Sequence, residues 1–282
     1  MSAGMSPYLK SLKFVAFDTE TTGLWAGSHR LVEIGAVRFK LDGSVEERFE
    51  SLINPEKAIP KEAQAVHRIT DQMVSSAPRA GAVLPRFLEF CGSNAILVAH
   101  NAPFDVSFLA CEMDRASLVR PQLLVLDTID LIRRTQPGLA SYALVKLIQH
   151  FRLGDNQDHR ALSDAEYVKT LTCLAFEKLG GINSLAKLSQ TLTICNLGQW
   201  SYDTIELPDR FGPLQEAIAG GLRIKMHYSK PATEPSWRVV HPLKIYGLTG
   251  RAYLNAWCER ARQERTFRLD RVLSFEILPE GR

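Results

Sequence analysis

The sequence lacks the features of a disulfide-stabilised, zinc-binding or membrane-spanning protein. Its 282 residues include five cysteines, an odd number with no CxxC pair, so neither a disulfide framework nor a cysteine-based zinc site is indicated. No apolar run approaches the roughly 20 residues of a membrane-spanning helix, and residues 1–13 lack the apolar centre of a signal peptide. We therefore expect a protein of the reducing cytoplasm without a membrane partner.

An excess of charge of one sign is also missing from the chain as a whole, where the net charge is only +3. Residues 204–282 nevertheless hold 13 Lys and Arg against 9 Asp and Glu, whereas residues 1–203 hold 21 against 22. The basic excess in the C-terminal third favours a polyanionic partner there. The length and the 45% content of hydrophobic residues are consistent with two globular domains.

Apolar periodicity and turn residues predict an α/β domain with a mixed sheet over the first two-thirds of the chain. The expected strands are Phe14–Phe17, Leu31–Phe39, Val45–Ile53, Ala95–Ala99 and Leu123–Leu126. The expected helices are Pro60–Val66, Thr70–Met73, Pro78–Phe90, Phe104–Ala116, Thr128–Arg134, a helix capped by Ser141 and running to His150, and Ala161–Leu179.

The remainder divides into a connector and a second domain. Residues 182–205 indicate a connector with one short helix, Ser184–Leu192. A helix is then expected from Pro213 to the Gly220-Gly221 pair. The strands that follow are Leu222–Tyr228, Val239–Tyr246, Tyr253–Cys258, Thr266–Leu269 and Val272–Ile277. Strands at this spacing predict a small, strongly curved sheet or barrel.

The apolar residues of the first expected strand run directly into two alternating acids, Asp18 and Glu20, at its end. Residues two apart in a strand point to the same side, so these carboxylates lie next to each other. Like charges at that separation disfavour ionisation unless a cation lies between them. Carboxylate oxygens suit Mg²⁺ or Mn²⁺, so the pair indicates a metal site. The alternative is a solvated strand end on which two acids alternate.

Two further acids and a histidine follow other predicted strand or loop ends. Asp105 follows the Ala95–Ala99 strand, at the type of strand end where sites collect in α/β sheets. Asp164 lies at the start of a helix, five residues after His159, a spacing that places the two on different helical faces. We therefore expect His159 in the loop before the helix. The alternatives are an ordinary first-turn acid at Asp105 and a solvated histidine.

In order and local context, these five residues resemble the signature of the DEDD exonuclease superfamily. The His-x-x-x-x-Asp spacing is that of its DEDDh, or DnaQ-like, branch, which residues 13–180 resemble throughout. The resemblance implies an RNase H-like α/β fold with a mixed sheet flanked by helices, over a domain of residues 1–181. It also implies a relationship to the proofreading subunit of bacterial DNA polymerase III. One departure is Arg68, where relatives often carry Gly.

The implied activity is that of a 3′→5′ exonuclease releasing nucleoside 5′-monophosphates from single-stranded DNA or RNA 3′ ends. Four acids would hold two divalent ions, Mg²⁺ or Mn²⁺, about 4 Å apart, and His159 would accept the proton of the attacking water. The metal ligands implied are Asp18, Glu20, Asp105 and Asp164. The residues implied to contact the terminal nucleotide are Thr19, Thr22 and Leu24, with His100 and Asn101 as further candidates.

Residues 206–282 resemble the WYL domain, a small Sm/SH3-like β-barrel, through Val239–Leu243, Arg251–Ala256 and Arg265–Arg271. The name-giving triplet is Ala252-Tyr253-Leu254, so its first aromatic residue is missing. The resemblance implies a regulatory domain that binds a nucleotide or nucleic acid. The candidate ligand residues are Tyr228, Tyr253, Arg251, Arg265, Arg268 and Arg271. The alternative is a solvated, salt-bridged face.

Other functions stay open at this point. The chain could be a nucleic-acid- or nucleotide-binding regulatory protein without significant nuclease activity, although the complete set of five site residues argues against this. It could be an RNA-trimming exoribonuclease, because the metal chemistry is indifferent to the sugar. Gln190–Ile194 faintly resembles a sliding-clamp peptide, so association with a polymerase or clamp is a further hypothesis beside a plain helix end.

Overall fold

The structure is a computed structural model that describes residues 6–24, 26–154, 159–192, 194–201, 207–230, 233–248 and 251–279. The chain divides into two compact units, Met1–Trp200 and Ser201–Arg282, and each is described by itself. Of the helices in these described ranges, none is long and apolar enough to cross a membrane.

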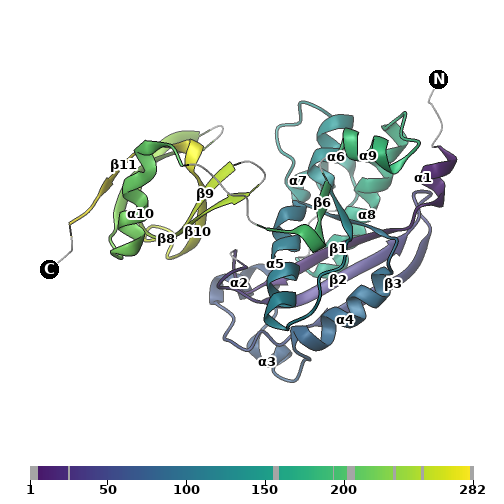
Figure 1. Ribbon diagram of the computed structural model, residues 1–282, viewed down its shortest axis with the longest axis horizontal. Coiled ribbons are helices and arrows are strands. Elements are labelled where there is room, and N and C mark those ends of the chain that lie inside the picture. Colours follow the sequence, from purple (N-terminus) through teal and green to yellow (C-terminus); the bar gives the residue numbers. More distant parts are fainter. Residues whose placement is uncertain are drawn as a thin grey trace. The chain divides into compact units, whose positions relative to one another are not determined.

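The first unit is built on a six-stranded sheet in the order β3-β2-β1-β4-β5-β6 (Figure 1). Strands β1, β4 and β5 are parallel to one another, and the remaining pairings are antiparallel, so the mixed sheet predicted from the sequence is confirmed. The strands are β1 (Phe14–Thr21), β2 (Leu31–Phe39), β3 (Val45–Leu52), β4 (Ile96–Ala99), β5 (Leu124–Asp127) and β6 (Ile194–Asn196).

Apart from α1, which the sequence did not predict, the helices of the first unit lie close to the predicted ranges. They are α1 (Pro7–Ser11), α2 (Lys61–His67), α3 (Asp71–Val74), α4 (Ala80–Cys91), α5 (Ala102–Arg115), α6 (Thr128–Thr135), α7 (Leu144–Phe151), α8 (Ala161–Lys178) and α9 (Leu185–Thr191). The predicted cap of α7 was wrong. Helix α7 begins after Ala143, and the Ser141 hydroxyl accepts a hydrogen bond from the Ala143 N–H, forming a turn before the helix.

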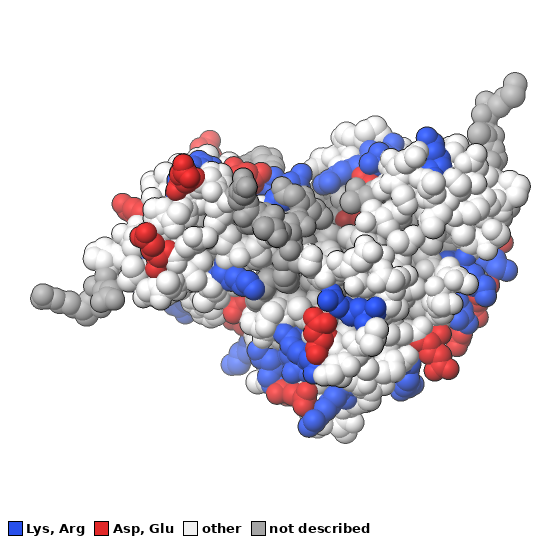
Figure 2. Space-filling model, viewed as in Figure 1, with Lys and Arg blue, Asp and Glu red and all other residues white. Residues whose placement is uncertain are grey.

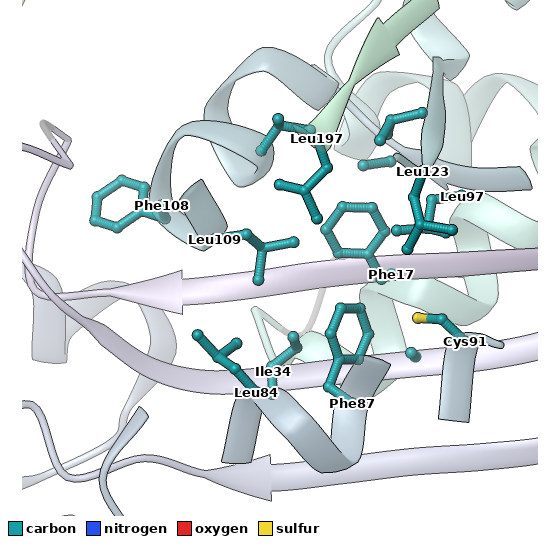
Figure 3. Packing of buried hydrophobic residues seen from close by; sticks show 14 of the residues in the cluster. Phe17, Ile34, Leu84, Phe87, Cys91, Leu97, Phe108, Leu109, Leu123 and Leu197 are labelled. Carbon is teal, nitrogen blue, oxygen red and sulfur yellow. The ribbon is translucent and has the colours of Figure 1, made fainter. Parts of the chain in front are cut away.

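The side chains of β1 alternate between two cores, one on each face of the sheet. Val15 and Phe17 pack with residues of α4 and α5, whereas Phe14 and Ala16 pack with residues of α6, α7 and α8. In the first core the Phe17 and Phe87 rings lie 5.9 Å apart between centroids (Figure 3). Residues 18 and 20 continue the face of Phe14 and Ala16, so their side chains point to the side covered by α8.

Residues predicted as a connector contribute to the first unit. Strand β6 pairs with β5, and Leu188 and Leu197 are fully buried. Within Gln190–Ile194, Leu192 is buried and Ile194 packs against the second core, while Thr193 lies outside the described residues. The apolar side chains that a clamp-binding peptide would insert into a partner are therefore engaged within this unit.

The second unit is a five-stranded antiparallel sheet in the order β10-β9-β8-β7-β11, with helix α10 (Gly212–Ala219) packed against one face. The strict alternation from Leu222 to Tyr228 in the sequence predicts one shared face, and Ile224, Met226 and Tyr228 indeed share the buried face of the first strand. The described pairings leave β10 and β11 as the two ends of the sheet, so closure into an Sm/SH3-like barrel stays a prediction. The strands are β7 (Ile224–Lys230), β8 (Thr233–Leu248), β9 (Arg251–Cys258), β10 (Gln263–Arg268) and β11 (Val272–Ile277).

Candidate active site

Four acidic side chains meet at the end of β1 from three elements. Asp18 and Glu20 lie on β1 itself, Asp105 lies in the first turn of α5, and Asp164 lies in the first turn of α8. Helices α5 and α8 cover opposite faces of the sheet, so their first turns bring one carboxylate to the same edge from each side. Asp105 and Asp164 are 2% and 1% exposed, which removes both from bulk water.

His159 lies beside two of these acids. One ligand atom each from Glu20, His159 and Asp164 lies within 4.8 Å of the other two. His159 precedes α8 and has a φ of 51°, in the left-handed region that non-glycine residues rarely adopt. The structure therefore has the arrangement expected from the spacing, with the histidine before the helix and the aspartate on it.

The clustering changes the ionisation of the carboxylates. Burial, reinforced by the charge of Asp164, raises the pKa of Glu20 to about 8. Burial likewise raises the pKa of Asp105 to about 7. Burial and the neighbouring carboxylates of Asp105 and Asp164 raise the pKa of Asp18 well above its ordinary value. A bound cation would relieve this repulsion, and a donor set of hard carboxylate oxygens fits Mg²⁺ or Mn²⁺.

The residues predicted to contact the terminal nucleotide differ in accessibility. Leu24 is 50% exposed and is available for a substrate contact. Thr19 is buried, and its hydroxyl donates to Asp105 Oδ1 at 2.6 Å, so it orients a candidate metal ligand. Thr22 is also buried, and its hydroxyl accepts from the Arg30 N–H at 3.0 Å. The Thr22 side chain therefore holds the loop after β1.

His100 and Asn101 form the turn between β4 and α5. His100 Nδ1 lies 2.8 Å from Thr128 Oγ1, and His100 Nε2 lies 2.9 Å from the Tyr142 carbonyl oxygen. Burial lowers the pKa of His100 to about 4, so the neutral ring donates from Nε2 and accepts at Nδ1. Asn101 is exposed with a φ of 65°, and its N–H donates to Asp127 Oδ1 at 3.0 Å. The His100 ring is thus committed to the fold, whereas the Asn101 side chain remains accessible.

The sequence did not point to three residues that lie close to the acids, namely Glu33, Arg160 and His67. Glu33 lies directly opposite Glu20 in the β1–β2 pairing and is fully buried, and it binds Arg160. His67 is buried at the end of α2, where its Nδ1 accepts from the Ile69 N–H at 3.0 Å. The signal for Glu33 was a single acid within a largely apolar strand, since a buried charge requires a partner.

Arg68 marks the one departure from relatives noted in the sequence. It ends α2 with a φ of 60°, the left-handed conformation in which a helix commonly terminates on glycine. The structure therefore gives the reason why glycine suits this position, and an arginine here accepts a less favourable backbone conformation.

The candidate ligand residues of the second unit do not share one surface. Tyr228 belongs to the core, where its hydroxyl accepts from the Arg268 N–H at 3.2 Å. Arg265 and Arg268 are three apart on β10, so they point to opposite faces. Tyr253 stacks on Tyr246 with the ring centroids 5.5 Å apart. The predicted set is therefore not accessible as one surface. Of its other members, Arg251 is exposed and Arg271 is partly exposed.

An exposed aromatic face of the second unit was also missed. Trp237 and Trp257 are 50% and 43% exposed. His227 stacks on Trp237 with centroids 4.8 Å apart, and Lys225 Nζ lies 4.8 Å from the centroid of the same ring. In the view of Figure 2, acidic and basic side chains are interspersed on both units rather than gathered into one continuous basic patch.

The fold and the acids define a hydrolase whose site is suited to divalent metal ions, and comparison with known proteins agrees. The model of the exonuclease family matches residues 15–172, and the model of the WYL domain matches residues 209–277. The chain belongs to the exonuclease family, in its DEDDh-type, DnaQ-like branch of 3′→5′ exonucleases, and carries a WYL domain after the exonuclease domain.

Individual relatives cover different shares of the chain. DNA polymerase III subunit epsilon of Treponema pallidum is 43% identical over 157 residues, which are 54% of this chain and 71% of that protein. The PolC-type DNA polymerase III of Clostridium perfringens is 36% identical over 168 residues, which are 59% of this chain but only 11% of that polymerase. The nuclease domain of 3′hExo, a DEDDh family member, has 13% identity and a TM-score of 0.52, covering 65% of this chain and 96% of that structure. That likeness supports the RNase H-like fold.

Proposed function

We propose that the protein is a metal-dependent 3′→5′ exonuclease that releases nucleoside 5′-monophosphates from single-stranded nucleic acid. The observation that supports this most is the meeting of four buried or partly buried carboxylates, three of them with raised pKa values, at the end of β1. Divalent ions bound there would activate water and stabilise the charge that develops on the leaving 3′ oxygen. The residues that would hold them are Asp18, Glu20, Asp105 and Asp164.

His159 is the proposed general base. The neutral imidazole of a histidine can accept a proton from an attacking water. Its position beside Glu20 and Asp164 places the imidazole within the acidic cluster. Thr19 holds Asp105 in orientation by a hydrogen bond, and the exposed Leu24 is proposed to contact the terminal nucleotide.

We expect DNA ends to be degraded faster than RNA ends. The relatives from Treponema pallidum and Clostridium perfringens are both named as DNA polymerase III proteins, and they match the part of the chain that carries the acids. The same names support a proposed association with a polymerase. End-labelled single-stranded and duplex DNA, with RNA strands of the same sequence, would distinguish these substrates, and faster release from RNA would support the exoribonuclease instead.

The decisive test is the substitution Asp18→Ala. The variant should lose the Mg²⁺- or Mn²⁺-dependent release of mononucleotides from labelled single strands, because one carboxylate of the cluster is gone. Asp42→Ala is the matched control, since Asp42 is an exposed acid of the β2–β3 turn. If Asp18→Ala retains the activity of the unaltered protein, the proposed function is wrong.

For the WYL domain, we propose binding of a nucleotide or a nucleic-acid strand that holds or regulates the substrate, on a sheet that closes into an Sm/SH3-like barrel. Exposed Trp237 and Trp257 with the adjoining Lys225 support a stacking surface for bases. The members of the set predicted by the sequence that are not fully buried remain candidates, namely Arg251, Tyr253, Arg265, Arg268 and Arg271. Fluorescence titration of the tryptophans with short single strands and with nucleoside monophosphates would test this binding.

A further inference from the structure

We propose that Glu33 and Arg160 form a clamp that positions His159 and Asp164 for the reaction. The inference rests on the proposed function, because it assigns these two residues a role only through the candidate base and the candidate ligand. Neither Glu33 nor Arg160 is proposed to touch substrate or metal. Both are therefore positioning residues.

The clamp joins β2 to the first residues of α8 through one buried carboxylate. Arg160 Nε lies 3.0 and 3.1 Å from the two carboxylate oxygens of Glu33, and Arg160 Nη2 lies 2.5 Å from Oε1. The N–H of Ala161 donates to Glu33 Oε2 at 2.8 Å. One fully buried side chain thus binds both the guanidinium that follows His159 and the first amide of the helix.

Gly35 provides a second fixed point, two residues from Glu33 on the same face of β2. A Cβ atom at Gly35 would lie 2.1 Å from the Leu162 nitrogen and 2.3 Å from the Ala161 carbonyl carbon. The backbone of the first turn of α8 therefore rests directly on the sheet. Together, the Glu33 carboxylate and the close contact at Gly35 leave this turn little freedom to rotate or slide.

Both candidate site residues are connected to Arg160. His159 immediately precedes it, and the Asp164 N–H donates to the Arg160 carbonyl oxygen at 2.9 Å. His159 also holds a left-handed φ of 51°, a conformation that persists only where surrounding contacts impose it. Fixing Arg160 from both its side chain and its backbone supplies such contacts, and displacement of Arg160 would move His159 and Asp164 together.

Two observations argue for positioning rather than for metal binding or simple stabilisation. Both oxygens of Glu33 already accept hydrogen bonds from Arg160 and Ala161, although Glu33 lies opposite Glu20 in the sheet. The Glu33 carboxylate is fully buried and loses its water, whereas the Arg160 side chain stays 40% exposed, so the pair chiefly offsets the cost of burying Glu33 and adds little net stability. The geometry that the pair imposes on α8 is the better account of its presence.

The test begins with the substitutions Arg160→Ala and Arg160→Lys in the full chain. We expect Arg160→Ala to lower kcat about 10²-fold, the scale of loss from displacement of a catalytic group by about 1 Å, while KM changes little. Arg160→Lys keeps the charge but not the two-pronged hydrogen bonding, so its kcat should lie between those of Arg160→Ala and the unaltered protein. The matched control is Arg48→Ala, which breaks the exposed ion pair of 2.8 Å between Arg48 on β3 and Glu166 on α8. It should leave kcat unchanged.

A double-substitution cycle separates positioning from a general loss of structure. Because the clamp positions both His159 and Asp164, adding Arg160→Ala to a His159→Ala protein should lower kcat further by clearly less than the loss of about 10²-fold in the unaltered protein, the remaining loss coming through Asp164. A full multiplicative loss in that background would overturn the clamp inference while leaving the proposed function intact. If His159→Ala alone retains full activity, the proposed base is wrong instead. Thermal unfolding checks that each variant is folded, and Glu33→Gln replaces Arg160→Ala in the cycle if that protein unfolds.

Discussion

In the first unit burial raises the pKa of Glu20 to about 8, whereas in the second unit a hydrogen bond from Arg268 lowers the pKa of Asp270. Glu20 is 9% exposed and lies among other acids, while the Asp270 side chain is 56% exposed and faces a cation. These two acids therefore contribute to folding with opposite sign at neutral pH.

This contrast shows how a chemical site differs from a structural ion pair. A lowered carboxylate pKa accompanies a contact that stabilises the folded protein, so its presence requires no further explanation. A raised pKa at several neighbouring carboxylates means that folding works against their charge. Such a cluster is retained for a partner that the protein itself does not supply, here a divalent cation. The contrast also suggests substitutions that compare the two units directly.

The largest expected effect is on catalysis. Asp164→Asn should reduce mononucleotide release at least about 10³-fold, because it removes one charge from the candidate metal site, while the fold is retained. Asp270→Asn in the second unit should change the rate by less than about twofold, because exposed ion pairs contribute little. Rates on a labelled single strand with Mg²⁺ would measure both. Equal effects of the two substitutions would remove the proposed distinction between the units.

The next effect concerns stability and pH in the absence of metal. Glu20 has a folded-state pKa of about 8 against an ordinary value of 4.5, so its protonated form is favoured by folding. The unfolded chain releases this proton near pH 4.5, and stability should therefore fall as pH rises from about 4.5 to about 8. Thermal unfolding with a chelator should show this slope, and Glu20→Gln or added Mn²⁺ should reduce it. A melting temperature of the metal-free protein that rises across this range would contradict the prediction.

A third comparison concerns two glycines. Gly35→Ala should lower the free energy of unfolding by roughly 1–3 kcal/mol, because the added methyl group overlaps the backbone of α8. It should also reduce kcat, since that backbone carries Asp164. At Gly212 in the second unit, an added Cβ would meet no atom within 4 Å, so Gly212→Ala is the matched control and should be neutral. Denaturant titration would measure both values, and a neutral Gly35→Ala would mean that α8 can move away from β2.

The smallest expected effect is on binding by the second unit. Trp237→Ala should raise KM for a single strand roughly fivefold without a change in kcat, since stacking on one base contributes about 1–3 kcal/mol. Leu243→Ala is the control, because Leu243 is a similarly exposed apolar residue of the same strand, at 45% against 50%. A fall in kcat with an unchanged KM would instead connect this face to the chemistry.

The sequence predicted the site best where the pattern of neighbouring residues alone determines the local structure. The alternation of β1 predicted that Asp18 and Glu20 share a face, and the five-residue spacing predicted His159 before a helix that carries Asp164. Both features depend on neighbouring residues alone. The resemblance to a known family joined these segments to Asp105 and implied a common site, which individual segments could not do because each acid has an ordinary structural alternative.

What the sequence did not predict depends on contacts between distant residues. Arg160 and Glu33 are 127 positions apart, and no local pattern pairs them. His100 was a candidate for nucleotide binding, but the structure places its ring between Thr128 and the Tyr142 carbonyl, which lie 28 and 42 positions away. In the second unit, alternation predicted the buried face of β7, but not that the Tyr228 hydroxyl is used within the core.

Strand β6 affects how the exonuclease unit can be separated from the rest of the chain. A shortened chain ending at Gly181 would leave β5 with an unpaired edge, and unpaired edge strands are prone to intermolecular pairing and aggregation. It would also remove Leu197 from the first core and the Trp200 carbonyl oxygen that accepts from Arg120 at 2.6 Å. Residues up to Trp200 thus cover the β5 edge of the sheet and complete the first core. A soluble catalytic fragment is expected to need them.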